Sequence, residues 1–262
     1  LLITAIAIVH TRNLFSAVML SGMFSLLLAS NFFLLDAADV ALTEAAVGAG
    51  ISTVLFLSAL TLTASREAAP PANRVIALVV VGITTLAVIY GTFDKPRFAD
   101  PEAPVHQHVA PWYMEKTREA IDISNVVTAV LGSFRGYDTL GEVFVVFTAG
   151  IGVLFLLGKY KGPHAYRRSG EPVGLRHYLI PRLAGRMIIP FIILFGLYVQ
   201  FHGEHGPGGG FQAGAIVAAS IMLYALLEGE KRALQVLSRR LLTFLIAFGA
   251  LLYGAVGVAG IL

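Results

Sequence analysis

The chain has 262 residues, of which 56% are hydrophobic and only 13% are charged. A soluble domain usually carries about 25% charged residues, so this composition excludes an ordinary soluble protein and predicts an integral membrane protein. The net charge of +3 is small and confined to loops, which argues against a nucleic-acid partner. Because the chain has no cysteine, disulfides, thiolate metal sites and iron–sulfur ligation are excluded together.

Apolar runs follow one another along the whole chain. A helix that crosses the hydrocarbon core of a bilayer needs about 20 apolar residues, so the opening run 1–9 is too short, and we expect it to be the end of a helix whose start is missing. Seven longer runs follow, at 14–35, 40–65, 75–93, 143–158, 187–201, 209–227 and 241–262. We therefore predict an all-α, polytopic membrane protein with about seven to eight transmembrane helices in the lipid bilayer.

The charge of the loops tests this order of spans. If residues 10–13 are cytoplasmic, the inner loops hold 13 of the 19 Lys and Arg residues and the outer loops hold four. The inner loops are then 10–13, 66–74, 159–182 and 231–240, and the outer loops are 36–39, 94–123 and 202–208. The positive-inside rule predicts this excess, which supports both the number and the order of the spans.

Two stretches of changed composition divide the chain. The first, 64–74, is a short turn rich in Pro and Ala, and the second, 158–182, is a basic loop with several Gly and Pro residues. The predicted domains are 1–65, 74–158 and 180–262.

The middle domain contains the longest polar loop. Its end, 111–123, is predicted to be a short helix that begins at Pro111, with Trp112 and Tyr113 at the membrane interface. The apolar segment 125–132 is too short to span the bilayer, and we expect an interfacial or re-entrant piece.

Glu44 is the single charged residue of the run 40–65 and lies within two turns of its outer end. An ionised carboxylate inside a membrane helix costs up to about 3 kcal/mol. Gly48 and Ser52 follow at i+4 and i+8, and small residues let a neighbouring helix approach closely. Glu44 is therefore predicted to face protein or a water-filled cavity, as a proton or cation relay. The alternative is a structural carboxyl near the headgroups.

The stretch "FRGYDTLGE" places Asp138 and Glu142 one helical turn apart. Like charges at i, i+4 share a face and repel, and such a pair can exchange a proton or bind a small cation. Arg135 lies three residues before Asp138, so an ion pair at the start of the helix is the alternative for Asp138. That alternative is weaker for Glu142, which lies one turn deeper.

The stretch "FHGEHGPGGGFQAG" brings His202 and His205 close together. Imidazoles change charge near physiological pH, which makes both candidates for a proton path. The pattern is not H-E-x-x-H and no third ligand stands out, so we expect neither a metal nor another cofactor. Gly208, Gly209 and Gly210 are predicted to form a tight turn between two helices; the alternative is a plain polar turn at the membrane surface.

Three of these stretches resemble known proteins. "DVALTEAAVGAGISTVLFL" resembles the MbhD-like domain, and "NVVTAVLGSFRGYDTLGEVFVVFTAGIGVLFLL" resembles the MbhE-like domain. "IPRLAGRMIIPFIILFGLYVQFHGEHGPGGGFQAGAIVAASIMLYALLEG" is similar to the MrpB subunit of Mrp-type multisubunit cation/proton antiporters. In that family the MrpB subunit is usually separate and continues with a further helix after the position of Leu262, so we expect either a fragment or a fused variant.

The resemblance implies a non-enzymatic subunit of a bacterial plasma-membrane complex that exchanges Na⁺, or another monovalent cation, for H⁺. Its partners would be MrpA-, MrpC-, MrpD-, MrpE-, MrpF- and MrpG-like subunits. Glu44 and Glu142 match acidic residues that are candidates for the ion path of the family, and Gly48 and Gly50 would permit a π-bulge like that of a relative in respiratory complex I. Two alternatives remain: a membrane-arm subunit of a hydrogenase or complex-I-like oxidoreductase, and an assembly scaffold.

Overall fold

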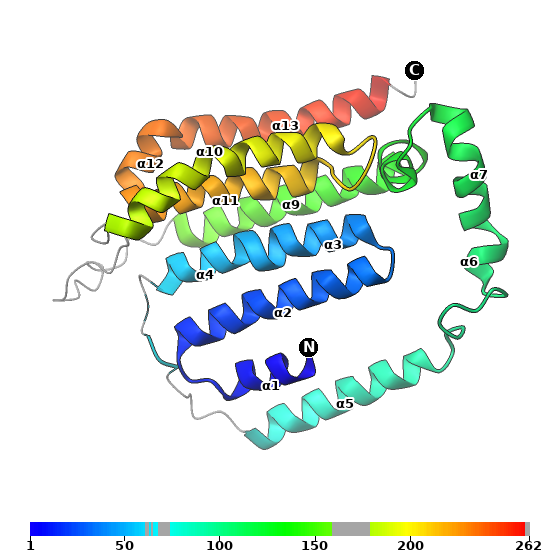
Figure 1. Cartoon of the computed structure of the whole chain (residues 1–262), viewed down its shortest axis with the longest axis horizontal. Coiled ribbons are helices and arrows are strands. Elements are labelled where there is room, and N and C mark those ends of the chain that lie inside the picture. Colours follow the sequence, from blue (N-terminus) through cyan, green and yellow to red (C-terminus); the bar gives the residue numbers. More distant parts are fainter. Residues whose placement is uncertain (61–62, 64, 68–73, 159–178, 260–262) are drawn as a thin grey trace.

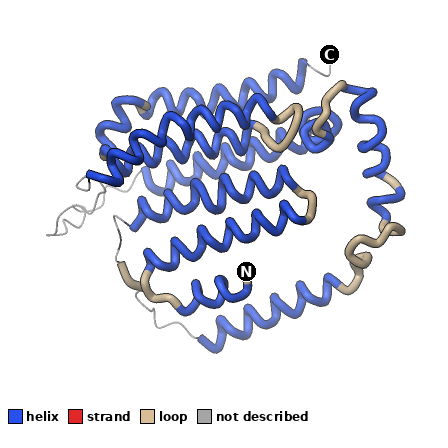
Figure 2. The backbone as a smooth tube through the Cα atoms, viewed as in Figure 1, coloured by secondary structure: helices blue, strands red, loops and turns tan. Residues whose placement is uncertain are grey.

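Helices form nearly all of the described chain in this computed structural model (Figures 1 and 2). The structure describes residues 1–60, 63, 65–67, 74–158 and 179–259. Seven helical spans in that part are long and apolar enough to cross a membrane, which confirms the predicted all-α polytopic fold. The elements are α1 (Leu2–His10), α2 (Leu14–Leu34), α3 (Ala38–Glu44), the π-helix η1 (Ala45–Ile51), α4 (Ser52–Leu60), α5 (Arg74–Thr92), α6 (Pro104–Gln107), α7 (Val109–Ile121), α8 (Val126–Ala129), the π-helix η2 (Val130–Phe134), α9 (Gly136–Gly158), α10 (Leu179–His202), α11 (Gly210–Glu228), α12 (Glu230–Val236) and α13 (Arg239–Ala259).

The turns between helices gather at two opposite ends of the molecule (Figure 1). The α2–α3 and α10–α11 turns, both predicted to lie outside, share one end with α7. The α1–α2 turn and α12, both in segments predicted to lie inside, are at the other end. This arrangement is the one that strictly alternating spans require.

The helices α10, α11 and the broken span α3–η1–α4 form the tightest part of the fold. Its buried core consists of Ala46, Val199, Ala213 and Ile216. Gly196 on α10 brings the backbones together, because a Cβ at that position would lie 2.9 Å from a methyl group of Val217. Membrane helices pack through such small residues because lipid gives them no hydrophobic driving force for association.

Helix α2 covers the other side of the broken span. The side chain of Asn13 caps its first turn by accepting a hydrogen bond from Ser16 N–H at 3.1 Å. Gly22 then admits Thr53 of α4, whose Oγ1 would lie 2.9 Å from a Cβ on Gly22. The π-helix is thus enclosed between α2 and α11.

An arch of short helices connects α5 to the rest of the chain (Figure 1). The predicted helix at 111–123 is α7, but it begins at Val109, so Pro111 lies inside its first turn instead of starting it. Trp112, Tyr113 and Phe134 pack ring against ring, with centroids 5.3–5.4 Å apart, which fixes α7 to the segment before α9. Helix α5 has no substantial packing partner among the described helices.

Three further features differ from the sequence predictions. The predicted re-entrant piece at 125–132 is a short α-helix followed by the π-helix η2, which ends at Phe134. The span expected to start at residue 187 begins eight residues earlier, at Leu179, because its first turns carry arginines that hydropathy counts against a membrane helix. The predicted inner loop 231–240 contains α12.

Candidate functional site

Glu44 lies where an α-helix changes into a π-helix. Helix α3 ends at Glu44, and the next seven residues, AAVGAGI, form η1. The hydrogen-bonded turn of a π-helix contains one residue more than that of an α-helix, and such turns are frequent at functional sites. The structure thus has the π-bulge that the two glycines were predicted to permit, immediately after the membrane carboxylate.

The carboxylate of Glu44 lies against Gly48 on the side of α2. A Cβ built on Gly48 would be 2.6 Å from Glu44 Oε1 and 2.5 Å from Ser25 Oγ. Both oxygens therefore converge on the space that a side chain at position 48 would occupy. The predicted protein neighbour of Glu44 is α2, and Gly48 keeps a polar space open between the two helices.

We expect Gly48→Val to disrupt this site, because two branched methyl groups would displace the carboxylate or push α2 away. The cation/proton exchange that the family resemblance leads us to expect should fall about tenfold or more, with overpacking costing about 1–3 kcal/mol of stability. Gly214→Val is the matched control, because a Cβ at Gly214 meets nothing within 4 Å. Thermal stability and transport should both be measured, and equal losses in the two variants would contradict the prediction.

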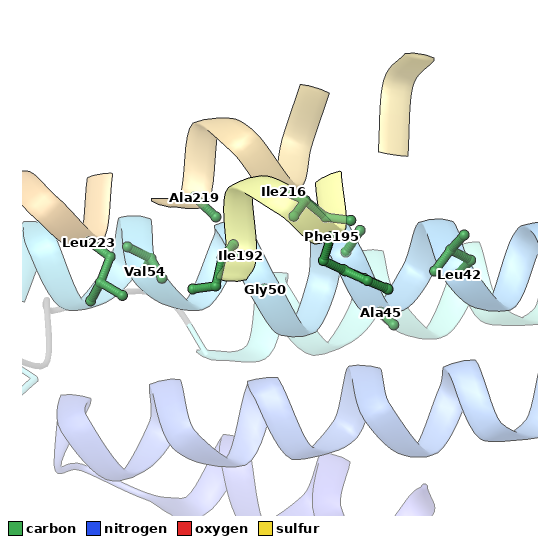
Figure 3. Close-up of a pocket in the computed structure, with 10 residues that line it drawn as sticks. Leu42, Ala45, Gly50, Val54, Ile192, Phe195, Ile216, Ala219 and Leu223 are labelled. Carbon is green, nitrogen blue, oxygen red and sulfur yellow. The ribbon is translucent and has the colours of Figure 1, made fainter. Parts of the chain in front are cut away.

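The opposite side of η1 borders an apolar cavity (Figure 3). Its volume is about 320 Å³, and only apolar residues line it, among them Leu42, Gly50 and Phe195. A cation entering this cavity would lose its water without gaining oxygen ligands. The polar side chains next to the π-helix, Glu44 and Ser25, lie on its other side, towards α2.

A second polar cluster joins the three predicted domains at the end of the bundle that loop charge predicts to be the outer one. The Nδ2 group of Asn125 donates to Asp39 Oδ1 at 3.3 Å and to the carbonyl of Gly206 at 2.8 Å. Gly208 N–H also donates to Asp39 Oδ1, at 3.3 Å. Sequence reasoning missed this cluster; its one signal was an Asn directly before a short helical run, the usual place of a cap.

Two further hydrogen bonds reinforce this junction. Gln212 Nε2 donates to Thr43 Oγ1 at 2.7 Å, joining α11 to the residue before Glu44. Thr128 Oγ1 donates to the carbonyl of Gly203 at 2.6 Å, joining α8 to the outer turn. The neighbourhood of Glu44 is thus held from α11 on one side and α2 on the other.

We expect Asn125→Ala to destabilise the chain more than Asn13→Ala. Both variants lose a helix cap, worth about 1 kcal/mol, but Asn125 also bonds to Asp39 and Gly206. The additional loss should be about 1–2 kcal/mol. Thermal unfolding of the purified complex measures the difference, and equal melting temperatures would contradict a role of Asn125 in joining the domains.

The glycine turn between α10 and α11 brings two stretches of backbone close together. A Cβ on Gly208 would lie 2.5 Å from the carbonyl oxygen of Val199, and Gly209 has a φ of +140°, which side chains other than glycine rarely adopt. The helix after this turn starts at Gly210.

The two histidines near this turn lie in different surroundings. The ring of His202 stacks on Tyr198 with centroids 4.9 Å apart, and His205 is exposed. Among the described residues, no group of three acidic or histidine side chains could hold a metal ion. A transport role for His202 and His205 stays a prediction.

Asp138 and Glu142 lie in the first two turns of α9. Arg135 pairs with Asp138, its Nε donating to Oδ2 at 2.6 Å, which is the alternative foreseen from their spacing. Glu142 is exposed and has no ion pair or hydrogen bond among the described residues. Because α9 packs against α13 and η2, whereas Glu44 lies between α2 and α11, the structure does not bring the two predicted acids together.

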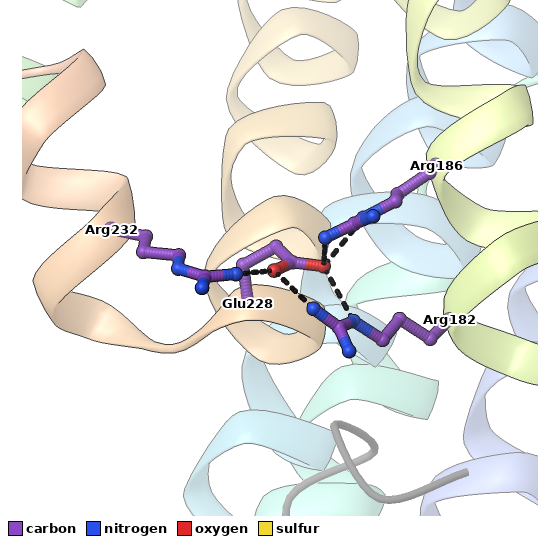
Figure 4. A network of polar contacts seen from close by, with 4 residues as sticks. All are labelled: Arg182, Arg186, Glu228 and Arg232. Atoms are coloured by element: carbon purple, nitrogen blue, oxygen red, sulfur yellow. Dashed lines mark hydrogen bonds and ion pairs between the residues drawn. The ribbon is translucent and has the colours of Figure 1, made fainter. Parts of the chain in front are cut away.

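Glu228 is a buried acid that sequence reasoning missed (Figure 4). The residue is 2% exposed and is the last residue of α11, at the predicted inner end of the bundle. Arg182 binds it with two bonds of 2.8 and 2.9 Å, Arg186 donates at 2.6 Å, and Arg232 pairs at 2.5 Å. This cluster fastens α10 and α12 to the end of α11.

Comparison with protein families assigns each part of the chain. Residues 1–65 match the MbhD family and residues 72–169 match the MbhE family, which are the D and E subunits of MBH. Residues 180–262 match the domain related to the MnhB subunit of the Na⁺/H⁺ antiporter.

Similar proteins include both antiporters and a respiratory complex. The probable K⁺/H⁺ antiporter A/B subunit of Rhizobium meliloti is 26% identical over 84% of this chain and 24% of its own length. The chain covers less than two thirds of the length of the curated relatives that match it.

Two solved structures match the fold. A chain of the Mrp complex from Dietzia sp. aligns with a TM-score of 0.68 and 26% identity over 88% of this chain and 26% of that chain. A chain of the archaeal membrane-bound sulfane sulfur reductase aligns with a TM-score of 0.53 and 30% identity over 72% and 74%. These matches and the three domain matches cover nearly the whole sequence. The chain therefore joins MbhD-like and MbhE-like parts to an MnhB-like part, and over most of its length it is similar to a chain of the Mrp complex.

Proposed function

We propose that the chain is a subunit of a Na⁺/H⁺ antiporter complex in the bacterial plasma membrane and carries part of the ion path past Glu44. The observation that carries this proposal is the membrane carboxylate at the α-to-π junction, beside the Ser25 hydroxyl and the space above Gly48. Carboxylates inside membrane spans mark ion pathways, and proteins named as antiporter subunits are among the relatives of this chain.

The chemistry we propose at Glu44 is competition between two ligands. The protonated carboxyl releases H⁺ when Na⁺ enters, and the Na⁺ then lies between the carboxylate and neighbouring hydroxyl oxygens. Ser25 Oγ is the oxygen placed for this, because it approaches the same point as Glu44 Oε1. Affinity for the cation should therefore rise with pH as protons leave the site.

The exposure of Glu142 supports the proposal that the chain assembles with further subunits. An acid in a membrane span is costly towards lipid, and Glu142 has no partner within the described chain. We propose that it meets a basic or polar residue of a neighbouring MrpA-, MrpC-, MrpD-, MrpE-, MrpF- or MrpG-like subunit.

Transport by the intact complex tests the function. Na⁺-dependent proton movement in inverted vesicles should be present with this chain and lost when the chain is deleted. Restoring the chain from a plasmid should restore exchange. Exchange that continues unchanged without the chain would refute the proposal.

A second candidate follows from the match to the sulfane sulfur reductase, of which the chain covers 74%. In that case the chain would belong to the membrane arm of a redox-driven pump. Purification of the native complex separates the two, since co-purification with an iron–sulfur peripheral arm would favour the redox-driven pump.

A further inference from the structure

The arginine cluster around Glu228 carries more positive charge than its acid neutralises. Three guanidinium groups face one carboxylate, which leaves an excess of two positive charges. Arg182 donates two hydrogen bonds to Glu228, through Nε and Nη2, and its side chain is 28% exposed. Arg186 and Arg232 are 48% and 47% exposed, and each guanidinium has five N–H donors. Both retain donors that face away from Glu228.

An apolar groove adjoins this cluster on the membrane side. It has a volume of about 240 Å³ and is lined by residues of α10, α11 and the α12 segment, among them Ile189, Ile193, Ile221, Tyr224 and Val236. The one aliphatic hydroxyl in its lining, that of Ser220, donates to the carbonyl of Val217 at 2.7 Å. The groove therefore offers hydrocarbon contacts, except at the Tyr224 hydroxyl.

Helical spacing aligns the groove with the charges. On α10, Arg182, Arg186, Ile189 and Ile193 follow at intervals of three or four residues, which places them on one face. On α11, Tyr224 lies one turn before Glu228. Val236, at the edge of the groove, is 67% exposed, so the groove opens to the surface of the chain.

From this arrangement we infer that the groove binds one acyl chain of an anionic phospholipid, whose phosphate lies on Arg186 and Arg232. The volume lies below the range of about 300–1,000 Å³ usual for drug-sized ligands, which suits a narrow, flexible hydrocarbon chain. The site is at the inner end of the bundle, where the positive-inside rule places the cytoplasmic leaflet and its anionic lipids. Arginine binds phosphate through paired N–H donors.

Native mass spectrometry of the purified complex tests this lipid site. Delipidated complex should be supplied with phosphatidylglycerol or phosphatidylcholine of the same acyl chains. The wild type should retain at least one phosphatidylglycerol, with about tenfold preference over phosphatidylcholine. Arg186→Gln/Arg232→Gln should lose that lipid about tenfold, while the bidentate Arg182–Glu228 pair still holds α10 to α11.

Two further variants separate the contributions of headgroup and chain. Arg12→Gln/Arg66→Gln removes two inner arginines elsewhere and should leave retention unchanged. Val236→Trp should fill the groove and lower retention with all three arginines intact.

Three outcomes would overturn the inference. The first is equal retention in the wild type and the Arg186/Arg232 variant. The second is equal retention of the two lipids. The third is displacement of the lipid by inorganic phosphate to the same extent in the wild type and in Val236→Trp. That result would mean that the arginines bind free phosphate.

Discussion

Glu44→Gln is expected to lower Na⁺-dependent proton exchange about tenfold or more while the complex still assembles. Glutamine has nearly the shape of glutamate, so it fits beside Gly48 and Ser25, but its amide can neither release a proton nor balance a cation. The measurement is proton uptake by inverted vesicles over a range of pH and Na⁺ concentrations, with assembly checked on a native gel.

Asp36→Asn is the matched control for this result. Asp36 lies in the outer turn eight residues before Glu44, is exposed, and has a φ of 58°, which asparagine also tolerates. Exchange should stay near that of the wild type. If Glu44→Gln exchanges as fast as this control, Glu44 is a structural acid, and the chain contributes to transport by holding other subunits.

The pH profile gives the same proposal a second test. Competition predicts that the wild type needs less Na⁺ for half-maximal exchange as pH rises, because fewer protons occupy the carboxylate. Any exchange that remains in Glu44→Gln should lose this dependence. A residual activity with an unchanged profile would place the competition at another residue, of which Glu142 is the first candidate.

The spans could be predicted because hydropathy is a property of some twenty consecutive residues and needs no knowledge of the packing. Glu44 stood out for the same reason, as a single charge in an apolar run. The sequence showed only that a π-helix is possible at this position. An α turn and a π turn differ by one residue in hydrogen-bond register, and the glycines allow both. In the structure η1 packs between α2 and α11, and these long-range neighbours cannot be read from the local sequence.

The tertiary clusters could not be predicted, because their members are far apart in sequence. Arg182 and Arg186 precede Glu228 by 46 and 42 residues, and Glu228 itself resembles an ordinary acid at the end of a span. Asp39 and Gly208 are likewise 169 residues apart, and the predicted role of Gly208 in a turn gave no reason to pair it with Asp39. One local signal was present: Glu228 and Arg232 at i, i+4, a spacing typical of helical ion pairs.

Glu228→Gln should have a large effect on assembly. Removing the carboxylate leaves Arg182, Arg186 and Arg232 facing one another around a neutral amide, so their mutual repulsion is no longer balanced by a negative charge. Because the cluster fastens α10 and α12 to α11, the MnhB-like part should open at its inner end. The amount of assembled complex in the membrane should fall on the order of fivefold, as measured by quantitative native gels.

Two variants show whether charge is the cause of that loss. Glu230→Gln removes the neighbouring acid, which is 74% exposed and pairs with Arg239 at 3.3 Å, and exposed pairs contribute little; assembly should be unchanged. Arg186→Gln added to Glu228→Gln removes one of the repelling charges and should recover part of the complex. If the double variant assembles no better than Glu228→Gln alone, the loss comes from the missing hydrogen bonds of the carboxylate and not from repulsion among the arginines.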